Sequence, residues 1–96
     1  MNKLTKKHID DLMSEVVVHT TTSSIPTPHV TAFAWLGTFQ LGTFQLGTAI
    51  SKAVDPANFN EDLGIEYSTK DVLKIAENKL WELEGYNLYK TLKGDK

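Results

Sequence analysis

The first residues of the chain carry the hydrophobic pattern of an amphipathic helix. Four apolar residues recur at intervals of three and four: Ile9, Leu12, Met13 and Val16. They would line one helical face, and Thr5 suits the N-cap because its hydroxyl can accept a hydrogen bond from the first turn. The β-branched residues 16–22 favour extended chain instead. We therefore expect a helix over about residues 5–16.

Residues 28–54 carry the pattern of a β-hairpin, preceded by a loop that contains two prolines. From residue 29 to residue 36, alternate positions fall on two faces, and both faces are largely apolar. One face has Val30, Ala32, Ala34 and Leu36, and the other has Thr31, Phe33 and Trp35. We expect one face to pack on a core and the other to need a helix or a partner.

A five-residue repeat lies in the middle of this hairpin. The sequence LGTFQ at residues 36–40 recurs at residues 41–45, and residues 46–48 begin a third copy. Because five is odd, successive copies would turn to opposite faces of a regular strand. We expect either a hairpin turn within one copy or a glycine bulge that resets the register. A neutral duplication and an exposed aromatic ribbon both remain open as its meaning.

A short helix and a longer one are predicted after the hairpin. Asp55 and Pro56 suit the N-cap and the first position of a helix over about residues 56–63, which Gly64 would end. Ser68 suits the N-cap of a helix over about residues 69–84.

Gly85 would end the longer helix, and an amphipathic tail follows it. Together the elements indicate a single α+β domain over residues 1–96. Its antiparallel β-hairpin or small sheet would pack against the N-terminal and C-terminal helices, because an isolated hairpin is marginal in water. A second copy of the chain could also supply that cover, so a homo-oligomer is considered.

The composition is that of an ordinary globular chain. The 96 residues are 41% hydrophobic and 23% charged, with a formal net charge of −2 and no cysteine. All ten basic residues are lysines, and because arginine is the usual reader of bases and phosphates, we expect no direct nucleic-acid binding. No apolar run approaches the ~20 residues that span a bilayer, so we expect no membrane association and a cytoplasmic location.

No residue pattern marks a catalytic, cofactor-binding or metal-binding site. The three histidines, His8, His19 and His29, lack the spacing of zinc ligands. The glycines of the repeat are five residues apart, unlike those of phosphate-binding loops, and no nucleophile elbow is present. We therefore expect no enzyme activity, no cofactor and no metal.

The candidate interaction surface combines hairpin aromatics with acidic residues of the following segment. Aromatic side chains dominate interface hot spots, and acids outnumber lysines by eight to three between residues 54 and 84. The candidates are Trp35, Phe39, Phe44, Glu61, Asp62 and Glu66. Core packing of the aromatics and simple solvation of the acids are the alternative readings.

Two stretches of the sequence resemble a known family. Residues 54–60 read VDPANFN and residues 76–88 read AENKLWELEGYNL, and they resemble a family of small tailed-bacteriophage and prophage proteins of the gene-forty-nine/gene-sixty-six type. The resemblance covers about residues 29–92 and implies a short N-terminal helix, a hairpin and a closing helix. Family hairpins usually turn through asparagine-glycine-phenylalanine, where this chain has the LGTFQ repeat. The resemblance implies a phage accessory protein made inside a bacterium, with no activity assigned to any residue.

These observations favour a phage-encoded accessory protein that acts by binding a host bacterial protein in the host cytoplasm. Its specific form would be an anti-defence inhibitor of the anti-CRISPR kind. Two alternatives stay open: an oligomeric binder of a small ligand such as a nucleotide signal, and a phage structural or assembly accessory protein.

Overall fold

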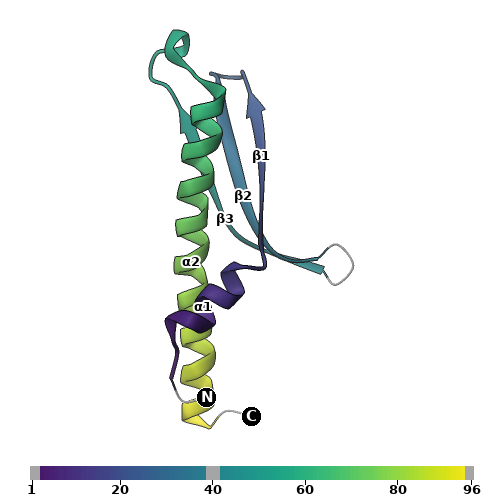
Figure 1. Cartoon of the computed structure of the whole chain (residues 1–96), viewed down its shortest axis with the longest axis vertical. Helices are drawn as coiled ribbons and strands as arrows, with labels where there is room; N and C mark the ends of the chain where they lie inside the picture. The colour runs from purple at the N-terminus through teal and green to yellow at the C-terminus, as the bar shows by residue number, and fades with distance from the viewer. Residues whose placement is uncertain (1–2, 39–41, 95–96) are drawn as a thin grey trace.

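A computed structural model of the chain describes residues 3–38 and 42–94. The elements in order are α1 (Lys6–Met13), β1 (Val16–Ser23), β2 (His29–Thr38), β3 (Gly42–Lys52), the 3-10 turn η1 (Pro56–Asn58) and α2 (Glu61–Lys93). Figure 1 shows α2 running along the sheet and beyond it, with α1 crossing its lower half. This arrangement confirms the predicted α+β fold class.

The sheet has three antiparallel strands in the order β1-β2-β3. The β-branched segment after α1 is therefore a third strand, which extends the predicted hairpin to a small sheet. Cross-strand partners share a face of the sheet. Val17 lies opposite Trp35, and Trp35 lies opposite Gln45, so these three residues point to the same side.

The hydrophobic core lies between the sheet and the two helices. Eight buried residues form it: Ile9, Ala32, Ala34, Leu46, Ala49, Val72, Ala76 and Leu80. The predicted division of β2 is correct, because Ala32 and Ala34 are fully buried whereas Phe33 and Trp35, on the other face, are half-buried. The alanines of the strands are small, so α2 can lie close to the sheet.

The helix α2 is a single helix of 33 residues, which corrects the predicted pair of helices. The predicted helix over residues 56–63 does not form as one element, because the short turn η1 ends at Asn58 and α2 begins at Glu61. The predicted helix ends at Gly64 and Gly85 are also wrong, since α2 continues through both glycines. Ser68, predicted as an N-cap, lies inside α2, where it is fully buried and its hydroxyl donates to the Ile65 carbonyl oxygen at 3.3 Å.

The actual ends of α2 carry conventional caps. Asn60 is the N-cap, and its side-chain oxygen accepts a hydrogen bond from the Leu63 N–H at 3.1 Å. Gly94 ends the helix with a φ of 84°, in the left-handed region that favours glycine. The cap predicted at Asp55 serves η1, because its carboxylate accepts from the Ala57 N–H at 3.0 Å.

Close packing explains why Gly64 does not end the helix. A Cβ atom at position 64 would lie 2.8 Å from Cγ2 of Val30, a side chain that is fully buried. Gly64 therefore lets the first turns of α2 rest directly on β2. Gly85 has no such contact, since a Cβ atom there would meet nothing within 4 Å.

The helix α1 ends at Met13, three residues before the predicted limit, because Val16 already belongs to β1. Its predicted N-cap is confirmed. The Thr5 side chain accepts a hydrogen bond from the His8 N–H at 3.2 Å, and Ile9 is fully buried one turn later.

The LGTFQ repeat crosses the β2–β3 hairpin, and residues 39–41 lie outside the described residues. The sequence predicted either a hairpin turn within one copy of the repeat or a bulge that resets the register. A β-bulge in β3 does reset the register. Ala34 pairs with Gly47 and Trp35 pairs with Gln45, which leaves Leu46 as the extra residue. Leu46 is buried, and Gly47 faces α2 so closely that an added Cβ would overlap Cγ2 of Ile75.

Candidate functional site

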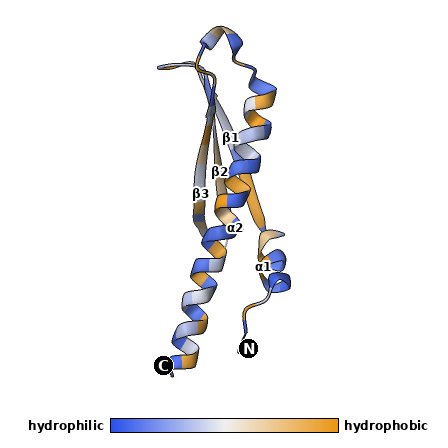
Figure 2. Ribbon diagram, turned by 90° about the vertical axis from the view of Figure 1, so that its left-hand side faces the viewer, coloured by the Kyte–Doolittle hydropathy of each residue, from blue (hydrophilic) through white to orange (hydrophobic). Residues whose placement is uncertain are grey.

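One side of the sheet is covered by α2 and α1, and no described helix covers the other side (Figure 2). We call this other side the open face. Four rows of cross-strand partners form it: Val17, Trp35 and Gln45; His19, Phe33 and Thr48; Thr21, Thr31 and Ile50; Ser23, His29 and Lys52. Val17 is 57% exposed and Ile50 is 59% exposed, although both are aliphatic.

Aromatic rings occupy two adjacent rows of the open face, toward its hairpin end. The rings of His19 and Phe33 stack with their centroids 6.4 Å apart, and Trp35 lies two residues beyond Phe33 on the same strand. Flanking β1 and β3 partly shield Phe33 and Trp35, which are half-buried. The open face therefore presents an apolar, aromatic strip held on a rigid sheet.

The β-bulge at Leu46 shapes the β3 side of the open face. Gln45 and Thr48 are three residues apart, so a regular strand would point them to opposite sides. The bulge places both on the open face, and Gln45 Nε2 donates a hydrogen bond to Thr48 Oγ1 at 2.9 Å. This bond orders the polar border of the aromatic strip.

The charge on the open face is low and positive. None of its twelve residues is an acid, and its one lysine is Lys52, at the end of β3. A surface of this kind suits contact with an apolar patch of a partner, because desolvating it requires the removal of few charges.

The structure divides the sequence-predicted surface residues among different places. Trp35 lies on the open face, and Phe39 lies outside the described residues. Phe44 is 52% exposed but shares the opposite side of the sheet with its partner Leu36, near the end of the hairpin.

The three acidic candidates lie on α2 and do not join Trp35. Glu61 and Asp62 occupy the first turn of α2, where their negative charges interact favourably with the helix dipole. Glu66 follows on the next turn. All three are exposed. In Figure 1 this end of α2 is at the top, while the hairpin bends away from α2 lower down. The single combined surface expected from the sequence is therefore two separate regions.

Sequence reasoning did not select Val17, His19, Phe33 or Ile50 as surface candidates. The alternation in β2 already placed Phe33 on the face of Trp35, but the other three residues come from strands whose pairing the sequence left open. The β-branched run VVVHTTTS was the sequence signal for a strand. In the structure, the first residues of this strand are alternately half-buried and exposed.

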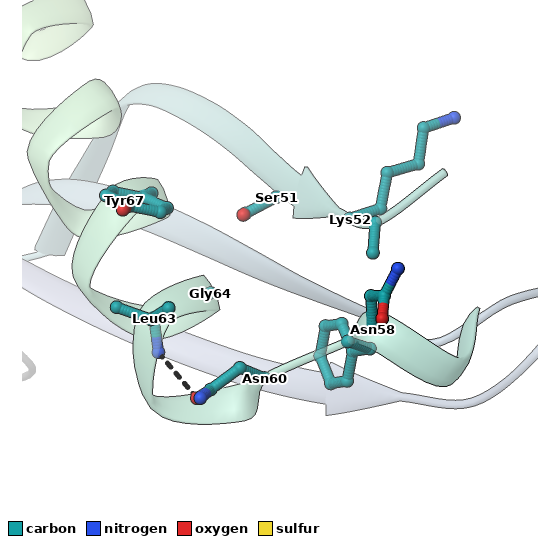
Figure 3. Close-up of a pocket in the computed structure, with 9 residues that line it drawn as sticks. Ser51, Lys52, Asn58, Asn60, Leu63, Gly64 and Tyr67 are labelled. Carbon is teal, nitrogen blue, oxygen red and sulfur yellow. Dashed lines mark hydrogen bonds between the residues drawn. The ribbon is translucent and has the colours of Figure 1, made fainter. Parts of the chain in front are cut away.

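A small pocket lies where β3 meets the start of α2 (Figure 3). Its volume is 140 Å³, and its lining includes Ser51, Lys52, Asn60 and Tyr67 together with Phe59. Sites for drug-sized ligands have volumes of roughly 300–1,000 Å³. This pocket is therefore too small to enclose a nucleotide within one chain.

A second pocket of 250 Å³ lies between the chain start and the last turns of α2, beside an ordered polar cluster. His8 Nε2 lies 2.9 Å from Glu84 Oε1, and the Asn87 amide donates to Glu84 Oε2 at 2.8 Å. The hydrogen bonds from Asn87 and His8 hold the pKa of the Glu84 carboxyl below its ordinary value, against the opposing effect of partial burial. This cluster ties α1 to α2.

Over the described residues, no group of three or more His, Asp or Glu side chains is placed to hold a metal ion. None of the described helices combines the length and the apolar character that crossing a membrane requires.

Fold and surface together define a small α+β protein in which α1 and α2 cover one face of a three-stranded sheet and no described helix covers the other. The family model described as Phage protein (N4 Gp49/phage Sf6 gene 66) matches residues 4–92. The chain belongs to this family of phage proteins, which confirms the resemblance seen in its sequence. Comparisons with curated proteins and with solved structures found no match.

Proposed function

We propose that this phage protein acts by binding a bacterial protein of the host cell through the open face. The observation that carries the proposal is the aromatic strip of His19, Phe33 and Trp35 on a sheet face that no described helix covers. Tyrosine, tryptophan and arginine lead interface hot spots, and central aromatic residues carry much of the binding energy of protein interfaces. A rigid sheet also keeps the entropy that is lost on binding small.

The low charge of the open face favours a protein partner over a nucleic acid. A nucleic acid would need several cations along its backbone, whereas the open face has only Lys52 at one end. The two pockets of 140 and 250 Å³ are below the usual size of a ligand site, so a nucleotide signal would need a cavity completed by another chain. The proposed mode of action is occlusion of the partner and involves no catalysis by this chain.

We further propose that the partner belongs to antiviral defence in the host cytoplasm. The support is the phage origin of the family together with the small size of the chain, which suits a blocking protein. Expression of the protein in defended cells should then restore phage growth, and the W35A variant should not.

The test of the binding proposal compares variants on the two faces of the sheet. A partner captured from host cells is purified and titrated with wild type, with W35A and with F44A. Trp35 is on the open face, whereas Phe44 is an exposed aromatic on the other side, so F44A is the matched control. W35A should weaken binding about tenfold or more, the effect of a hot-spot truncation, and F44A should change it little.

Unchanged affinity of W35A would refute the open face as the binding surface. Single-stranded oligonucleotides and mixed nucleotides are titrated in parallel. Saturable binding of either one by wild type, lost in W35A, would replace the protein partner by that ligand class.

A further inference from the structure

Strand β1 forms one edge of the sheet and lacks the features that usually protect an edge. Within the described residues it pairs only with β2. Its sequence, VVVHTTTS, contains no lysine, proline, glycine or acid, and its pairing with β2 shows no bulge. Natural edge strands are blunted by charges, prolines or bulges, because their free backbone groups otherwise pair with another strand.

The opposite edge, β3, is protected in several ways. It contains the bulge at Leu46 and ends in Lys52. The helix α2 also lies against it, since Ile75 contacts Gly47, and Tyr67 lines the small pocket together with Lys52. The contrast between the two edges selects β1 as the strand that is free to pair.

The chain exposes more surface than a compact monomer of its mass. Its accessible area is 6917 Å², whereas the scaling of monomeric proteins gives about 5,500 Å² for 10.7 kDa. Its radius of gyration is 16.7 Å, against about 12.5 Å expected for a compact domain of this length. The excess area, about 1,400 Å², is larger than the ~800 Å² that each partner buries in a standard interface.

We propose that two copies of this chain pair antiparallel along β1 and form a dimer with a continuous six-stranded sheet. The two copies are related by a two-fold axis, because β1 of one copy meets β1 of the other. The contact therefore stops at two copies. Backbone hydrogen bonds of strand addition supply the contact, and the exposed Val17 gains cover from the added strand. Figure 1 shows the outer side of β1 clear of other elements over the half nearest its end at Ser23.

The faces of the two sheets restrict the register of this pairing. A continuous core requires both copies of α2 on the same side of the joined sheet, so opposed residues must belong to the same face. Two registers near full overlap of β1 satisfy this condition. In the first register, centred on His19, this residue lies opposite His19 of the second copy. In the second register, centred on Thr20, His19 lies opposite Thr21 of the second copy.

Both registers are tested by one double variant, H19K/T21K. Lysines at these positions point into solvent in the single chain, so folding is retained. In the dimer they place like charges opposite each other in either register, which destabilises cross-strand pairs. The matched control is T48K/I50K, which puts two lysines on the same open face but on β3. Circular dichroism and urea unfolding check that both variants fold.

The measurement is the molecular mass of the purified full chain by sedimentation, over about a 100-fold range of concentration. Wild type and T48K/I50K should show twice the 10.7 kDa mass of the chain at the upper concentrations. H19K/T21K should raise the dimer dissociation constant about tenfold or more. A monomeric wild type would overturn the proposal, as would a folded H19K/T21K that dimerises like wild type. Loss of the dimer in both variants would indicate that the open faces of two copies stack. Loss of the dimer in T48K/I50K alone would indicate pairing through β3. Either result would also overturn the proposed pairing along β1.

The oligomeric state is measured without any host partner. A dimer that binds no partner, or a monomer that binds one, would therefore separate this inference from the proposed function.

Discussion

The two glycines inside α2 should respond in opposite ways to alanine. Both lie in the helix interior, where alanine is favoured over glycine by about 1 kcal/mol. At Gly85 an added Cβ meets nothing within 4 Å, so G85A should raise the free energy of unfolding by up to about 1 kcal/mol.

At Gly64 the same methyl group would lie 2.8 Å from Cγ2 of Val30. Val30 is fully buried and β-branched, so it cannot turn away without moving its neighbours. Overpacking of this kind usually costs about 1–3 kcal/mol, which exceeds the gain in helix propensity. G64A should therefore be destabilised by up to about 2 kcal/mol relative to wild type.

The difference between the two variants isolates the packing contribution, because the gain in helix propensity is common to both. We expect G85A to be more stable than G64A by about 1–3 kcal/mol, measured by urea unfolding at one fixed protein concentration. Val30→Ala provides the control. It should cost less in the G64A background than in wild type, because it removes the overlap. Equal stability of G64A and G85A would refute the close approach of α2 to β2.

Two further predictions concern the N-cap of α2 and the polar cluster around Glu84. Asn60→Ala removes the side-chain acceptor of the Leu63 N–H and should lower the free energy of unfolding by about 1 kcal/mol; thermal unfolding of wild type and variant checks it. Glu84→Gln should destabilise the fold at pH 7. The folded pKa of Glu84 is depressed by Asn87 and His8, so its stabilising effect is present above the unfolded pKa of about 4.3 and is lost as the pH falls through the folded pKa. Urea unfolding from pH 7 down to pH 3 should show that the difference in free energy of unfolding between wild type and variant becomes small near pH 3. A difference that does not vary with pH would contradict this.

Local signals along the sequence predicted the elements better than their limits. Thr5 and Asp55 cap the turns that follow them, as predicted, because a cap depends only on the next three residues. The helix end predicted at Gly64 failed for the opposite reason. A glycine reads locally as a stop, but at position 64 it is required by contact with Val30, which lies on a strand far away in the sequence.

The open face was only partly accessible from the sequence. The alternation in β2 divided Ala32 and Ala34 from Phe33 and Trp35 correctly, because the period of a strand is independent of its neighbours. Which strands flank β2, and in which register, depends on pairing between distant segments and on the bulge at Leu46. That pairing brought His19 beside Phe33 and separated Trp35 from the acids of α2.

The two tryptophans of the chain make it possible to measure whether a partner covers the open face. Trp81 packs against the core and Trp35 lies on the open face, so the variant W81F leaves a single fluorescent reporter there. Acrylamide quenching of Trp35 is measured while the purified host partner is added to saturation. As the partner binds, quenching of Trp35 should fall and its emission should shift to shorter wavelength. Saturated binding with unchanged quenching and emission of Trp35 would contradict it.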